Sequence, residues 1–107
     1  MSTRREKIEA LLKNEPHDQF LRYGLACEFD NEERHDESLA IFQGLMADQP
    51  PHVASFLRGA QLLVSMDRLG DARAVLRQGI EIARQQGELH AAGEMGELLA
   101  GLGPLGD

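Results

Sequence analysis

The stretch RYGLACEF, residues 22–29, has a counterpart in FLRGAQLL, residues 56–63. In both stretches an alanine stands three positions before a large apolar residue. Pro16 and Pro50 are separated by the same interval as the two stretches. A pattern that returns at a fixed period, here about 34 residues, indicates stacked repeats, in which each supersecondary unit buries its apolar face against the next.

Apolar residues recur at intervals of three and four along the chain, which is the spacing of one helix face. No polar/apolar alternation between hairpin turns indicates strands. Thr3-x-x-Glu6 has the pattern of a capping box and predicts the start of the first helix. Pro50 and Pro51 separate two helices, because proline lacks the amide donor and disfavours helical backbone in the residue before it. The chain is therefore predicted to be all-α, with about six short helices.

Six short helices could form a bundle or a solenoid, and the period favours the solenoid. The first unit reads R-x-x-L-A-x-x-F from Arg22 and S-x-x-x-F from Ser38, and ends at a proline. The second reads F-x-x-G-A-x-x-L from Phe56 and A-x-x-x-L from Ala72. This pattern resembles the tetratricopeptide repeat (TPR), W-x₂-L-G-x₂-Y…A-x₃-F…P. The resemblance implies an all-α, TPR-like antiparallel helix-hairpin solenoid.

The resemblance extends over about residues 4–100 and has three departures. Arg22 stands where the family has tryptophan, Ser38 where it has alanine, and Arg84 where the second repeat would have proline. Only two units are complete, fewer than a stable array usually needs, so flanking helices or a dimer partner are expected to cover the ends. We expect one domain over 1–100, made of a lone helix (3–13), two repeats (17–50 and 51–84) and a terminal helix (88–100), followed by a flexible tail over 101–107.

The TPR resemblance implies a protein-interaction module rather than an enzyme, with a concave groove that receives a peptide or a partner helix. The groove positions are Phe20, Tyr23, Gly24, Cys27 and Asp30 in the first repeat and Ala54, Leu57, Arg58, Gln61 and Val64 in the second. Of these, the expected binding residues are Phe20, Tyr23, Cys27, Leu57, Arg58, Gln61 and Val64. Some TPR domains grip a terminal carboxylate with a clamp, but here only Arg58 falls on such a position, which favours an apolar peptide or helix. Alternatively, Tyr23, Cys27 and Leu57 pack against the terminal helix, and the sequence leaves both readings open.

Composition limits the classes of partner. The net charge of −7 disfavours binding to nucleic acid. No apolar run approaches the ~20 residues that cross a bilayer, and no apolar secretory segment follows the charged start MSTRREKIEALL. Cys27, the single cysteine, allows neither an internal disulfide nor a thiolate metal site. We expect a cytoplasmic protein with a protein partner and no membrane or nucleic-acid partner.

The remaining motifs predict no metal, dinucleotide or catalytic site. No two of the four histidines (17, 35, 52 and 90) stand four apart on one helix, so no metal site is expected. GLGPLG at 101–106 matches G-x-G-x-x-G in letters, but it follows a helix and ends the sequence, so it lacks the context of a dinucleotide site. No polar residues converge from separate helices in the predicted array. We expect no catalytic residue, cofactor or metal.

Charge is unevenly distributed, and this gives the alternative function. Residues 28–37 hold six acids and one arginine, whereas Arg73, Arg77 and Arg84 lie roughly along one face of a helix. Such stripes are usually solvated faces, and we expect the same here. The two regions could also form a head-to-tail contact between copies, which would make the protein a self-associating scaffold or a homodimer.

Overall fold

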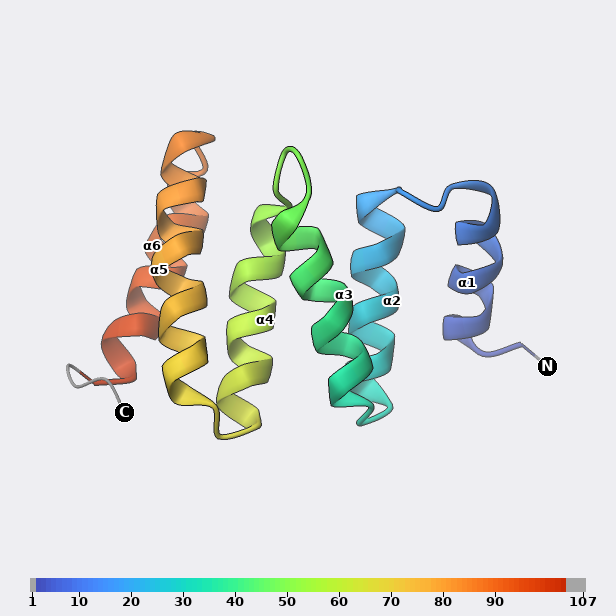
Figure 1. The fold of residues 1–107 in the computed structure, drawn as a ribbon, viewed down its shortest axis with the longest axis horizontal. Helices are drawn as coiled ribbons and strands as arrows, with labels where there is room; N and C mark the ends of the chain where they lie inside the picture. The colour runs from blue at the N-terminus through green and yellow to red at the C-terminus, as the bar shows by residue number, and fades with distance from the viewer. Residues whose placement is uncertain (1, 104–107) are drawn as a thin grey trace.

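The computed structural model describes residues 2–103, which contain six α-helices and no strand. The helices are α1 (Arg4–Asn14), α2 (Gln19–Asn31), α3 (His35–Ala47), α4 (Val53–Ser65), α5 (Leu69–Gln85) and α6 (Leu89–Gly101). They follow one another along an elongated molecule of 47 × 29 × 19 Å, with α1 and α6 at opposite ends (Figure 1). The predicted all-α array of six antiparallel helices is confirmed.

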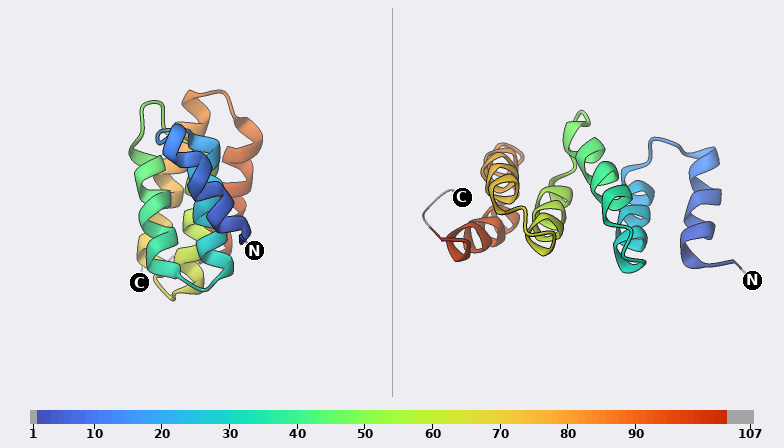
Figure 2. Two further views of the ribbon diagram at one scale, coloured as in Figure 1. Left: turned by 90° about the vertical axis from the view of Figure 1, so that its right-hand side faces the viewer. Right: turned by 60° about the horizontal axis from the view of Figure 1, so that its bottom comes forward.

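The array has two layers. Each helix packs against the next in sequence, and α4 also contacts α6. As a result α2, α4 and α6 form one layer and α3 and α5 form the other (Figure 2, right). Helix α1 lies at the N-terminal end and packs on α2. Helices α2 and α4 of the first layer are the two that the TPR resemblance assigns to the groove.

The sharp turns after α2, α4 and α5 use the same backbone device. Glu33, Asp67 and Gly87 adopt left-handed φ angles of 61°, 59° and 76°. In each turn the amide of the following residue donates to the carbonyl five positions earlier, at 2.8, 2.9 and 2.8 Å. These are Schellman-type endings, which satisfy free carbonyls of the helix and reverse the chain. They place the following helix antiparallel to the one before it.

The core follows the repeat positions. Phe42 and Leu76, which are one period apart, are both fully buried, each in one of two apolar clusters. Ser38 and Ala72 are also fully buried at equivalent positions. The Ser38 hydroxyl donates to the Ala26 carbonyl at 2.7 Å, so this departure from the family pattern leaves no unsatisfied donor.

Arg22, the second departure, fastens the loop between α3 and α4. Its guanidinium donates to both carboxylate oxygens of Asp48, at 2.5 and 3.3 Å. Gln19 donates to the same carboxylate at 3.1 Å and to the Pro50 carbonyl at 2.9 Å. The hydrogen bond from Arg22, together with that from Gln19, holds the pKa of Asp48 below its usual value. Two side chains of α2 therefore fix the loop that leads into α4.

This ion pair makes the stability of the fold depend on pH. Because the folded-state pKa of Asp48 is lowered, the pair stabilises the fold above the pKa of an unfolded aspartate and is lost as pH falls through the lower folded value. We expect Asp48→Asn to lower the melting temperature by about 2–4 °C at pH 7. The difference from wild type should shrink as pH falls below the ordinary aspartate pKa of about 3.9 and through the lower folded value of Asp48. Glu81→Gln, an exposed site on α5 with the same change in charge, is the control. An equal deficit at every pH would contradict the assignment.

The arginine stripe is only partly solvated, so the expectation was wrong for Arg73. Its side chain is 5% exposed and donates to the Leu102 carbonyl at 2.7 Å, whereas Arg77 and Arg84 are exposed. The reason is that the end of α6 packs beside α5, and Leu102 contacts both apolar clusters.

The first three residues of the segment 101–107 belong to the described structure. Gly101 is the last residue of α6, and Leu102 is held by the contact with Arg73. Residues 104–107 lie outside the described part of the chain.

Candidate functional site

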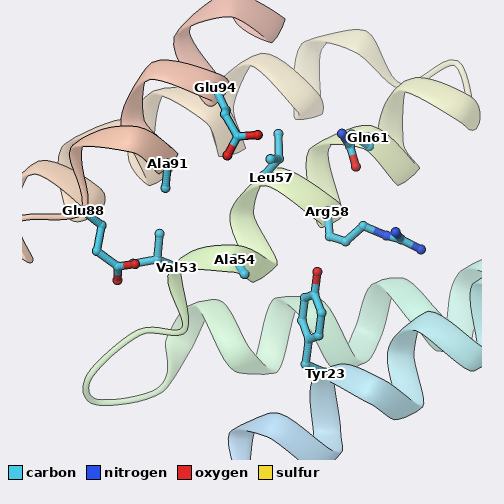
Figure 3. A pocket seen from close by; sticks show the side chains of 9 residues that line it. All are labelled: Tyr23, Val53, Ala54, Leu57, Arg58, Gln61, Glu88, Ala91 and Glu94. Atoms are coloured by element: carbon cyan, nitrogen blue, oxygen red, sulfur yellow. The ribbon is translucent and has the colours of Figure 1, made fainter.

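A hollow of about 300 Å³ lies on the layer formed by α2, α4 and α6 (Figure 3). We call it the central groove. Helix α4 forms its floor with residues spaced three and four apart, which share one helix face. Helices α2 and α6 form its sides. The lining residues are Tyr23, Val53, Ala54, Leu57, Arg58, Gln61, Glu88, Ala91 and Glu94.

Tyr23 is anchored on the α2 side of the groove. Its ring meets Phe42 edge-on, with centroids 5.7 Å apart, and lies 5.1 Å from the ring of His52. His52 is in turn held by a 2.8 Å hydrogen bond between its Nδ1 and the Ser55 hydroxyl. Figure 3 shows the ring rising from α2 with its hydroxyl toward α4. Tyr23 therefore presents a polar tip in a fixed position.

Burial tunes the titratable groups around this ring. It raises the pKa of the Tyr23 phenol and of the neighbouring Cys27 thiol. Burial also lowers the pKa of His52, which favours the neutral imidazole at neutral pH. These three groups are therefore uncharged near neutral pH, and the charge of the groove comes from its arginine and glutamate side chains.

The charged side chains of the groove differ in whether an ion pair compensates their charge. Arg58 lies 3.4 Å from a carboxylate oxygen of Asp30, so its charge is already compensated. Glu94 is 3.6 Å from Nε2 of His90, and within residues 2–103 no side chain forms an ion pair with Glu88. Glu94 lies on α6 and Glu88 directly precedes that helix, so both line the same side of the groove. Among the described residues, neither glutamate forms an ion pair with a lysine or arginine, so that side carries uncompensated negative charge.

A second hollow of about 460 Å³ lies between α1 and α2, and we call it the N-terminal cavity. It contains Phe20 and Leu11, whose surfaces are 81% and 55% exposed. Tyr23 lines both the N-terminal cavity and the central groove. The residues around it are Arg4, Lys7, Ile8, Leu11, Phe20, Leu21, Tyr23, Gly24, Cys27 and Glu28.

The structure separates the seven binding residues expected from the sequence into three groups. Tyr23, Leu57, Arg58 and Gln61 line the central groove together. Phe20 and Cys27 line the N-terminal cavity, beside Tyr23. Val64 lines neither hollow and packs against the first apolar cluster. Leu57 also packs against the second cluster, which includes residues of α6, so packing against the terminal helix and lining the groove coexist.

Sequence reasoning missed Glu88, Ala91 and Glu94. Helix α4 begins one period after α2, at Val53 after Gln19, whereas α6 begins at Leu89, later than the Gly87 that the period predicts. The repeat period therefore loses its register before α6.

Two negative findings concern residues 2–103 alone. No helix there is long and apolar enough to cross a membrane. No three or more histidine, cysteine, aspartate or glutamate side chains of this part of the chain are placed to hold a metal ion.

Comparison with known proteins adds two similar structures. No protein-family model and no curated protein matches the sequence. The solution NMR structure of a tetratricopeptide repeat domain protein from Salinibacter ruber aligns with a TM-score of 0.77 and 31% identity, over 81% of this chain and 88% of that one. The crystal structure of a tetratricopeptide repeat domain protein from the same organism aligns with a TM-score of 0.74 and 30% identity, over 80% of this chain and 96% of that one.

Proposed function

Because the chain belongs to the tetratricopeptide repeat family, we propose that it is a protein-interaction module whose central groove binds a peptide or a helix of another protein. The observation that carries this proposal is the convergence of side chains from three helices of one layer on a single open hollow. Concave sites that combine an apolar floor with a few placed polar groups are typical of binding sites.

The chemistry of the groove supports a protein ligand. Ala54 and Leu57 offer apolar contact on the floor, while the Tyr23 hydroxyl and the Gln61 amide can form hydrogen bonds with a peptide backbone. Tyrosine is a favoured anchor at interfaces, because a large rigid ring carries a polar tip. The side chains of the groove include no nucleophile paired with a base, which favours binding over catalysis. The net charge of −7 favours a protein over a nucleic acid.

Filling the groove tests the proposal. Ala54 is exposed on α4 and lines the groove, so Ala54→Trp should occupy the hollow without disturbing either apolar cluster. The probes are peptides selected on the wild-type protein from a random displayed library. They should bind this variant at least about tenfold more weakly, because the indole ring takes the place of the ligand. A tenfold loss corresponds to about 1.4 kcal/mol of binding free energy. Fluorescence polarisation with labelled synthetic peptides measures the affinity.

Ala74→Trp is the matched control. Ala74 is also an exposed helical alanine, but it lies on α5, in the other layer. The substitution and its cost in helix propensity are the same, so the peptides should keep their affinity within about twofold. Equal affinity for the wild type and for Ala54→Trp would place binding outside the central groove.

A further inference from the structure

Resting on the proposed function, we propose that the partner is an amphipathic protein segment, with a large apolar side chain for the N-terminal cavity and a lysine or arginine for Glu88 and Glu94. The central groove and the N-terminal cavity act as one polarised binding surface, apolar at the α1 end and acidic at the α6 end.

The first observation is continuity. Tyr23 lines both hollows, so they meet at one side chain on α2. The helices that form them follow one another along the molecule from α1 to α6 (Figure 1). A single segment that crosses Tyr23 can therefore contact both.

The second observation is exposed apolar surface at the α1 end. Phe20 is 81% exposed and Leu11 is 55% exposed, and both lie in the N-terminal cavity. Large apolar side chains gathered in a hollow favour a partner that covers them. Arg4, which lines this cavity, is 3.3 Å from Glu28, so its charge is compensated, while Lys7 on the same lining repels a basic side chain.

The third observation is uncompensated negative charge at the α6 end. Arg58, the one cation of the central groove, is paired with Asp30, whereas Glu88 forms no ion pair within residues 2–103. Within residues 2–103 the ion-pair partner of Glu94 is His90, and its side chain extends toward Leu57 (Figure 3). A basic side chain complements this end, and a terminal carboxylate would be repelled by it.

Charge neutralisation in the full chain tests the acidic end. The probes are synthetic copies of peptides, long enough to reach both hollows, that were selected on the wild type from a random displayed library. We expect the selected peptides to combine lysine or arginine with a large apolar residue. Glu88→Gln with Glu94→Gln should weaken binding at least about fivefold. Glu81→Gln with Glu97→Gln makes the same change in charge at exposed sites outside the groove and should change the affinity less than about twofold.

A second matched pair tests the apolar end. Phe20→Ser should weaken binding several-fold, while Leu89→Ser, which removes a 69% exposed side chain outside both hollows, should not. Both sites are exposed on helices, so both variants are expected to fold, and circular dichroism checks this.

The outcomes separate the two proposals. Peptides that lose affinity with Ala54→Trp but lack basic residues, or that ignore the loss of Glu88 and Glu94, would overturn this inference and leave the groove proposal standing. If no selected peptide responds to Ala54→Trp, both proposals fail. If the protein alone is a dimer in analytical ultracentrifugation and Ala54→Trp makes it a monomer, the occupant is a second copy and this inference is overturned.

Discussion

Replacement of Phe42 by alanine is expected to lower the free energy of unfolding by about 3–5 kcal/mol. The side chain is fully buried among residues of α2, α3 and α4, and its ring also meets Tyr23. The loss combines the transfer free energy of the ring with the cost of the cavity that remains. In a domain with a total stability of about 5–15 kcal/mol, this is a large fraction. Denaturant titration followed by circular dichroism measures it.

Phe20→Ala is the control for this experiment. It makes the same chemical change on a neighbouring helix, but the Phe20 side chain is largely in water. We expect an effect within about 0.5 kcal/mol, as is usual for surface substitutions. Equal losses in the two variants would mean that Phe42 does not occupy the core position given by the repeat.

Gly79→Ala is expected to lower the free energy of unfolding by about 1–3 kcal/mol, although alanine is the better helix former by about 1 kcal/mol. An added Cβ at Gly79 would lie 2.5 Å from Cβ of Phe56 and 2.7 Å from Sδ of Met95. The Cβ of Phe56 is bonded directly to the backbone of α4. Relief of the contact therefore requires α4 and α5 to move apart. Thermal and chemical unfolding both measure the loss.

Gly59→Ala is the paired comparison, because the substitution, the helical setting and the burial are alike. Here the added Cβ would lie 2.5 Å from Cε of Met46, the end of a flexible side chain, and 3.5 Å from Cβ of Phe42. The Met46 methyl group can rotate away, and methionine adapts readily to such changes. We expect a net change within about 1 kcal/mol. If Gly59→Ala were as harmful as Gly79→Ala, the closeness of α4 and α5 would not be the cause.

The sequence predicted residue positions best within the two repeats, which have the same length. Tyr23 and Leu57 are one period apart, and both line the central groove at positions that the TPR resemblance implies. The period could not place the glutamates of the α6 side, because α5 has 17 residues where α3 has 13 and the register changes after it. It also could not show that Arg73 is buried, since the partner of that side chain is the carbonyl of Leu102 beyond the repeats. Contacts between units and ends depend on packing that no period encodes.

The setting of Tyr23 gives the protein a built-in optical reporter. The chain has one tyrosine and no tryptophan, so its near-ultraviolet signal and its intrinsic fluorescence come chiefly from this ring. The ring is wedged between the core, through Phe42, and the surface where the two hollows meet. Ligand binding and loosening of the first apolar cluster would therefore both alter the emission of one chromophore. Titrations on the unlabelled protein can follow occupancy directly, and a melting curve recorded on the same signal reports the packing behind it.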